Sequence, residues 1–151
     1  MNYIVSADEM KDFPVGPAGS HASIFNGEQH GLPAISLMLA EIYPGEGPAW
    51  HRHSYDEAFV IAEGTATYTI GEDLVEASPG QVVFIPAGIP HSFVNSGEGM
   101  LRQTAVHASP TVTIEWLEAP VREMAGVDDT TGTGDAGASV SNRDRDDDRQ
   151  S

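Results

Sequence analysis

The sequence predicts a single all-β domain, a small antiparallel β-barrel with at most short helices. Short apolar or alternating segments recur along the chain and are separated by clusters of Gly, Pro, Asn and Asp. A chain of 151 residues with 40% hydrophobic residues can bury one sizeable core. No internal repeat is visible, so one barrel fits better than a duplicated one. We place this domain at residues 1–126.

Strands account for most of the predicted domain. We expect them at residues 34–43, 57–62, 65–70, 81–86, 91–95, 101–107 and 111–117. In the third of these segments three threonines alternate with Ala66, Tyr68 and Ile70, which is typical of a strand with one wet and one buried face. Ser6 followed by Glu9 resembles a capping box and predicts one helical turn through Asp12. Residues 119–125 predict a second short helix.

The composition changes near Gly126. Residues 127–151 are rich in Asp, Gly, Thr, Ser and Arg and contain little that could form a core, so we expect a disordered acidic tail. The tail holds seven Asp and three Arg, a net charge of −4, which leaves −12 of the total −16 on residues 1–126. The acidity therefore belongs mainly to the folded part.

Charge and composition exclude several classes of protein. A net charge of −16 repels phosphate backbones and anionic lipid headgroups, so we expect neither nucleic-acid nor membrane partners. The chain has no cysteine, which excludes disulfides, thiolate nucleophiles and sulfur ligands for metals. Residues 1–13 lack the pattern of a signal peptide, and no apolar run is long enough to span a bilayer. We therefore expect a cytoplasmic protein.

Four residues with metal-binding side chains, His51, His53, Glu57 and His91, are the strongest functional signal. In a strand His51 and His53 point to the same face, whereas a straight strand would carry Glu57 about 13 Å past His53. The chain must turn at residues 54–56, and we expect Glu57 on the neighbouring antiparallel strand, facing the histidine pair. A second turn, at Pro86 and Gly88, would let His91 begin the strand that returns.

Neutral imidazoles and one carboxylate suit a divalent transition metal. Fe, Mn, Co, Ni, Cu and Zn all accept such ligands, and the sequence does not choose among them. Four protein ligands on an octahedral ion leave open positions for water, dioxygen or a bidentate substrate. A purely structural metal more often has a closed tetrahedral site, frequently with thiolates. We therefore predict one open metal site, in which Glu57 is either a ligand or a catalytic acid or base.

Two motifs carry a family resemblance. Residues 45–64 match G-x5-H-x-H-x3-E-x6-G, and residues 80–95 match G-x5-P-x-G-x2-H-x3-N, both without a gap. In this respect the chain resembles the cupin superfamily, and the short segment between the motifs is similar to that of small single-domain microbial cupins. The resemblance implies a double-stranded β-helix of the jelly-roll type with the metal inside. It implies no single reaction, because such barrels host oxygenases, isomerases, lyases, cyclases and sensors.

Strand parity predicts what else lines the interior. If Glu57 faces inward, so do Phe59 and Ile61, and Phe93 follows His91 in the same way. Gln103 and His107 share one face of their strand and Arg102 takes the other; we place Gln103 and His107 inside. The alternative for His107 is an ordinary core or surface histidine. The glycines of the two motifs are expected at turns, and Asn95 in a structural role.

Other catalytic patterns are missing from the sequence. The chain has one lysine, Lys11, no G-x-S-x-G motif and no phosphate-binding glycine loop. Only Arg52, Arg102 and Arg122 add positive charge to residues 1–126, which suits a polyanionic substrate poorly. An apolar or aromatic small molecule fits better.

Three functions remain open at this stage. The first is a metal-dependent, dioxygenase-like enzyme, the second a non-oxidative isomerase, cyclase or lyase, and the third a non-catalytic ligand-binding or sensing module. We also expect a homodimer, with residues 34–43 offering a strand edge for pairing across a two-fold axis.

Overall fold

A computed structural model of the chain describes residues 2–119. Within it, residues up to Leu117 form one compact unit. The expected tail at residues 127–151 and all but the first residue of the expected helix at 119–125 lie outside the described residues.

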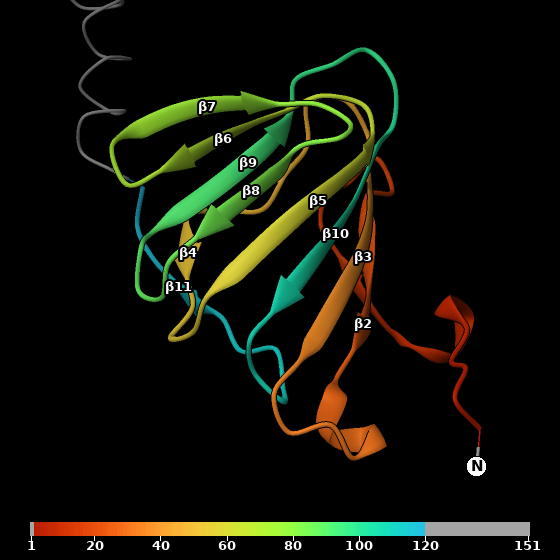
Figure 1. Ribbon diagram of the computed structural model, residues 1–151. Coiled ribbons are helices and arrows are strands. Elements are labelled where there is room, and N and C mark those ends of the chain that lie inside the picture. Colours follow the sequence, from red (N-terminus) through yellow and green to blue (C-terminus); the bar gives the residue numbers. More distant parts are fainter. Residues whose placement is uncertain (1, 120–151) are drawn as a thin grey trace, which may run out of the picture. The chain divides into compact units, whose positions relative to one another are not determined.

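The described residues form two antiparallel sheets, as the sequence predicts (Figure 1). One sheet has six strands in the order β1-β2-β3-β10-β5-β8, and the other has five in the order β11-β4-β9-β6-β7. The strand bounds are β1 Lys11–Pro14, β2 His21–Phe25, β3 Ser36–Ile42, β4 His51–Arg52, β5 Glu57–Glu63, β6 Ala66–Ile70, β7 Asp73–Ala77, β8 Val82–Ile85, β9 His91–Asn95, β10 Leu101–His107 and β11 Glu115–Trp116. Within residues 2–119 helical structure is limited to two short 3-10 turns, η1 (Ala7–Glu9) and η2 (Gly27–His30).

The predicted strands differ from the observed ones mainly at the edges of the fold. The structure adds β1, β2 and β7, and it reduces the predicted strand at 111–117 to Glu115–Trp116. The capping box of Ser6 and Glu9 is present, but the turn ends early because Asp12 already pairs with Ser23 between β1 and β2. Short strands such as these have weak periodicity, and pairing with a neighbour decides their conformation.

Two expectations about strand neighbours are wrong. Glu57 does not lie on the strand beside the histidine pair, because β4 pairs with β9 and β11 whereas β5 pairs with β10 and β8. Glu57 therefore approaches the histidines from the opposite sheet. Residues 34–43 also offer no free edge, since β3 lies between β2 and β10. The strands at the ends of the six-stranded sheet are β1 and β8.

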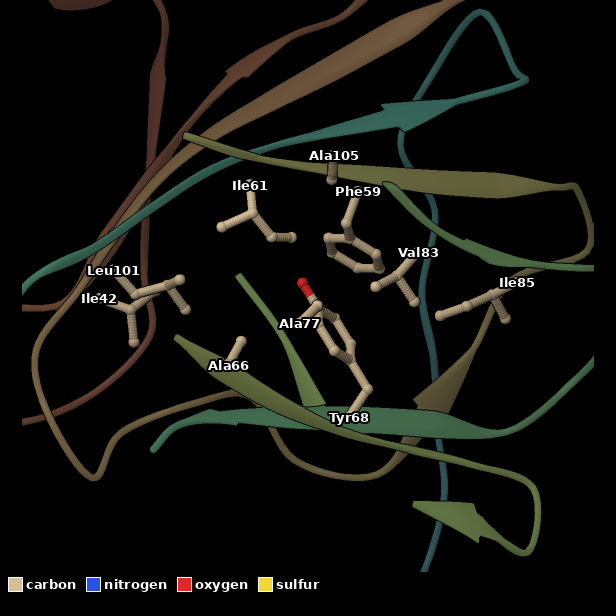
Figure 2. Packing of buried hydrophobic residues seen from close by; sticks show 10 residues of the cluster. All are labelled: Ile42, Phe59, Ile61, Ala66, Tyr68, Ala77, Val83, Ile85, Leu101 and Ala105. Carbon is tan, nitrogen blue, oxygen red and sulfur yellow. The ribbon is translucent and has the colours of Figure 1, made fainter. Parts of the chain in front are cut away.

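An apolar core fills the space between the two sheets (Figure 2). Phe59 and Ile61 face inward from β5, and Tyr68 faces them from β6 with no exposed surface. The rings of Phe59 and Tyr68 pack against each other, with their centroids 5.1 Å apart. The core cluster consists of Ile42, Phe59, Ile61, Ala66, Tyr68, Ala77, Val83, Ile85, Leu101 and Ala105. This packing gives the interior a rigid wall on which a site can be built.

Two motif residues have structural roles, as the sequence predicts. The Asn95 side chain is buried and donates to the carbonyl oxygens of Ile42 and Gly99, each at 2.8 Å. Gly64 has a φ of 90°, and a Cβ there would lie 2.5 Å from the carbonyl oxygen of Met100. Only glycine combines that conformation with so close an approach.

Candidate metal centre

Four strands from both sheets bring the polar residues of the interior together. β4 supplies His51, with His53 just beyond its end, and β9 supplies His91, which is the direct register partner of His51. From the other sheet β5 supplies Glu57, whose register partner on β10 is His107. All five side chains are buried, and His107 has no exposed surface at all. The four side chains that the sequence predicts to converge do lie together between the sheets, and His107 lies with them.

The side-chain atoms face one another at close range. Oε1 of Glu57 lies 3.1 Å from Nε2 of His91 and 3.2 Å from Nε2 of His53. Oε2 of Glu57 lies 3.2 Å from Nε2 of His107. His51, His53 and His91 form one group of possible metal ligands and His53, Glu57 and His107 another, each with ligand atoms within 4.8 Å of one another. His53 and Glu57 thus link four imidazoles into one cluster.

Backbone carbonyls fix the tautomer of three of these histidines. Nδ1 of His51 lies 2.7 Å from the carbonyl oxygen of Ala49, Nδ1 of His91 lies 2.8 Å from that of Ile89, and Nδ1 of His53 lies 2.6 Å from that of Thr113. A carbonyl oxygen can only accept, so each Nδ1 carries the proton and donates it. The lone pair of each ring is then on Nε2, which faces the cluster.

The Nδ1 atom of the fourth histidine, His107, contacts a tyrosine hydroxyl instead of a backbone carbonyl. The Tyr55 hydroxyl lies 2.8 Å from Nδ1 of His107, donates to the carbonyl oxygen of Thr113 and accepts from the Thr113 amide, both at 3.1 Å. The Tyr55 hydroxyl therefore holds Nδ1 of His107, and the tautomer of that ring sets which of the two groups donates. Thr113 therefore supports His53 directly and His107 through Tyr55. Sequence reasoning missed both Tyr55 and Thr113. A backbone carbonyl such as that of Thr113 leaves no signature in the sequence, and the contact of Tyr55 with His107 joins residues that are far apart along the chain.

Burial and mutual contact set the protonation of the cluster. Burial lowers the pKa of His51 to about 4, so this ring is neutral near pH 7. Burial would also raise the pKa of Glu57, but its contacts with His107, His53 and His91 outweigh that effect and hold the pKa well below the usual value. Burial disfavours charge on His53, yet the neighbouring Glu57 carboxylate prevails and raises the pKa of that ring.

A cation resolves an otherwise repulsive arrangement. With the Nδ1 protons donated outward, the Nε2 lone pairs face each other and an ionised carboxylate in a buried space. Lone pairs at 3.1 to 3.2 Å repel unless a proton or a metal ion lies between them. Nε2 of His107 in addition has no well-aligned hydrogen-bond partner. Neutral imidazole nitrogens and a carboxylate are ligands that divalent transition metals accept, so the residues fit such an ion.

The cluster opens into a small apolar cavity of about 50 Å³. Apolar side chains from both sheets and from the segment after β10 make up most of its walls: Phe13, Val15, Ala22, Met38, Ala40, Ile42, Pro48, Phe59, Phe93, Ala105, Ile114 and Trp116. Gln103 is the one polar lining residue outside the cluster among the described residues. A volume of this size holds little more than one or two water molecules beside the cluster, so a larger ligand requires wall side chains to move.

The predicted pocket residues divide into two groups. Phe59, Phe93, Gln103 and His107 line the cavity, and Arg102 is exposed on the outer face, as parity predicts. Ile61 is buried in the apolar core and does not line this cavity. His107 lies closer to the centre than expected, because its Nε2 contacts Glu57 directly.

The other two histidines lie away from the cluster. His21 lies on the outer surface within reach of Asp12 and Glu41, and His30 stacks on Phe25 at a centroid distance of 4.6 Å.

Comparison with known proteins identifies the family. Residues 38–107 match the family model described as the cupin domain. An uncharacterised protein of Streptomyces coelicolor is 34% identical over 76 residues, which cover 50% of this chain and 71% of that protein. The chain belongs to the cupin superfamily, in agreement with both motifs and the two-sheet fold.

Solved structures share this fold. The polyketide cyclase RemF of Streptomyces resistomycificus aligns with a TM-score of 0.63 at 20% identity, over 80% of this chain and 88% of that chain. Oxalate decarboxylase of Bacillus subtilis, studied for its Mn(II) centres, aligns with a TM-score of 0.68 at 17% identity, over 82% of this chain but only 36% of that one. At these identities the likeness concerns the fold alone. Within the described residues no helix is long and apolar enough to cross a membrane.

Proposed function

We propose that this protein is a mononuclear, divalent-metal-dependent enzyme that acts on a small apolar or aromatic organic molecule. One observation carries the proposal: four imidazoles, with the lone pair fixed on Nε2 in three, converge with a carboxylate at the end of an apolar cavity. A structural role for the metal would not require a cavity beside it. Open space next to the ligands favours a site where a substrate binds.

The residues divide into ligands and supporting groups. His51, His53 and His91 hold the metal through Nε2, and Glu57 contributes a carboxylate oxygen from the opposite sheet. Carbonyl contacts on each Nδ1 orient the rings and increase their basicity. When bound, a divalent transition ion supplies Lewis acidity or redox chemistry at this position. His107 is either a further ligand or a group that exchanges protons with Glu57.

Oxygenation is the reaction class that we propose first. Histidines with one carboxylate and open positions are the ligand pattern of non-haem Fe(II) oxygenases, and the apolar walls favour an apolar substrate over a charged one. The walls also exclude bulk water from the cluster, which protects reactive species from side reactions.

A specific contact favours non-oxidative chemistry as the second candidate. Nε2 of His107 and Oε2 of Glu57 lie 3.2 Å apart beside the cavity, and Nδ1 of His107 is held by Tyr55. Such a pair could move a proton to or from a bound carbonyl compound or enol, and a divalent ion held by the neighbouring histidines would supply Lewis acidity there. This would be an isomerase, cyclase or lyase reaction, and the fold shared with a polyketide cyclase is compatible with it.

Metal analysis followed by an oxygen-uptake screen tests the proposal. The protein is purified without added metal, its metal content is measured, and aromatic and enolic compounds are tested for turnover with and without oxygen. Iron and substrate-dependent oxygen uptake would support the first reaction class, and anaerobic turnover would support the second. Tight binding without conversion would favour the third possibility, a ligand-binding or sensing module. A protein that binds no divalent metal would contradict the proposal.

We also propose a homodimer, as expected from the sequence, but through another surface. β8 ends its sheet and exposes Val82 and Phe84, the latter by 73%, and neighbouring Val60 adds to the same apolar face. An unpaired apolar strand edge of this kind favours pairing with a second copy. A solution mass near the 16.0 kDa of one chain would contradict it. A cytoplasmic location stays a prediction of the sequence.

A further inference from the structure

Outside the metal cluster, one buried polar group of the described cavity lining has no hydrogen-bond partner. Gln103 is only 3% exposed, lines the cavity from β10, and its Nε2 makes no hydrogen bond. Its Oε1 accepts the hydroxyl proton of Tyr68. A buried amide donor left unpaired lowers the stability of the folded protein, so proteins rarely keep one without a use.

Tyr68 fixes which end of the amide faces the cavity. Tyr68 has no exposed surface, and its hydroxyl makes one hydrogen bond within the described residues, to Gln103. Burial raises the pKa of Tyr68 well above the usual value, so the phenol keeps its proton and acts as a donor. A donor requires an acceptor, which assigns Oε1 to Tyr68 and leaves the two Nε2 protons free. Figure 2 shows the Tyr68 hydroxyl pointing into the space between the sheets.

Small apolar residues flank Gln103 on its own strand and on the neighbouring one. Ala105 follows on the same face of β10, between Gln103 and His107, and Ala40 is the register partner of Gln103 on β3. Both are small and apolar, so neither competes for the amide protons. Phe59 and Phe93 form further apolar walls of the same cavity. Outside the metal cluster, the described lining residues offer two neutral polar donors, the buried Gln103 amide and the N–H of the half-exposed Trp116 indole.

We propose that Gln103 binds the ligand of this cavity by donating from Nε2 to a neutral carbonyl or enol oxygen. This inference rests on the proposed function only in taking the cavity as the place where substrate binds. It defines the substrate class as an apolar molecule that carries an oxygen acceptor, in contrast to a plain hydrocarbon or a ligand that only donates. Tyr68 is the positioning residue, because it holds the carboxamide in the donating orientation.

A matched pair of probes tests this recognition. The probes are 1-indanone and indane, which share a carbon skeleton and differ in the carbonyl oxygen. Calorimetric titration of the full chain is done with and without zinc. We expect the wild-type protein to bind the ketone about tenfold more tightly than the hydrocarbon, the effect of one hydrogen bond that satisfies a buried donor. In Gln103→Met, which keeps length and apolar volume, the two probes should bind equally.

A second variant keeps the test valid if Gln103→Met does not fold. Tyr68→Phe retains the ring in the core but removes the hydroxyl, so the carboxamide can rotate and present Oε1 instead of Nε2. We expect the preference for the ketone to fall severalfold, with thermal unfolding showing that the variant is folded. An unchanged preference in both variants, or none in the wild-type protein, would contradict the proposal.

Zinc affinity separates this inference from the proposed function. Within the described residues the Gln103 side chain is hydrogen-bonded to Tyr68 and not to a cluster residue, so Gln103→Met should bind zinc as the wild-type protein does, measured by competition with a chelator. If no variant binds zinc while the metal-free protein still distinguishes the probes, the proposed function fails and the role of Gln103 stands. If zinc binds normally but the probes are not distinguished, only the role of Gln103 fails.

Discussion

The two ends of the barrel interior are built from the same strands but differ in chemistry. β5 begins with Glu57 at the cluster and continues inward with Phe59 and Ile61. β9 begins with His91 and continues with Phe93 toward the apolar end. One end is thus polar and held by hydrogen bonds to backbone, whereas the other is apolar and held by packing. The comparison teaches that the rigid apolar end positions the polar end, because every cluster residue on these strands shares a backbone with core residues.

The largest effect should follow from removing a ligand at the polar end. His53→Ala deletes the residue that belongs to both groups of possible metal ligands, so metal affinity should fall by more than about 100-fold, beyond the loss expected for a supporting residue. The loss of affinity is measured as the metal content that remains after dialysis against a chelator. Trp50→Phe is the control, because Trp50 is adjacent in sequence but outside the cluster, and should keep its metal. Equal loss in both variants would show that the ligand assignment is wrong.

The apolar end should respond in stability and not in metal binding. Ile61→Ala removes a side chain that is 2% exposed and should lower the free energy of unfolding by about 2 to 5 kcal/mol. Neighbouring Val60 is 44% exposed, so Val60→Ala should change the free energy of unfolding far less. Denaturant titration measures both. If folded Ile61→Ala protein also loses its metal affinity, the two ends do not act separately.

Lowering the pH should reduce the free energy of unfolding of the metal-free protein through the groups at the polar end. The pKa of His51 is about 4 in the folded chain and near 6.5 when unfolded, so between these values the unfolded state binds more protons. The stability that His51 contributes is present above pH 6.5 and is lost as pH falls toward 4, by about 3 kcal/mol. The low pKa of Glu57 acts in the same direction at still lower pH, whereas the raised pKa of His53 acts in the opposite one.

His51→Gln isolates this contribution. Unfolding free energies of the wild-type and variant proteins, measured at several pH values between 4 and 7, should converge toward the acid end because the variant lacks the titrating ring. Parallel curves for the two proteins would mean that His51 does not titrate as described.

The smallest effect should come from the support beneath the cluster. Tyr55→Phe keeps the ring that stacks on His53 at 5.1 Å but removes the hydroxyl that holds His107. Metal affinity should fall about tenfold, as for other groups that orient ligands, and the visible spectrum of the cobalt-loaded protein should change. Tyr43→Phe, on an exposed ring, is the control. If the spectrum and the metal affinity are both unchanged, Tyr55 does not support the metal site.

Local patterns in the sequence are enough to predict the fold family and the residues with metal-binding side chains. His51, His53, Glu57 and His91 are recognisable because local spacing and turn residues carry the pattern, and strand parity placed Phe59, Gln103 and His107 inside. These are short-range properties of the chain, since alternation in a strand depends only on neighbouring residues.

Only the tertiary structure decided which of these residues meet. The pairing of Glu57 with His107, the separation of β4 and β5 into different sheets, and the support from Thr113 and Tyr55 all depend on register between distant segments. Parity tells which face a side chain takes but not which partner lies opposite, because a shift by two residues preserves the face and changes every contact. Register is fixed by packing of the whole domain, and the identity of the fifth residue in the cluster was fixed with it.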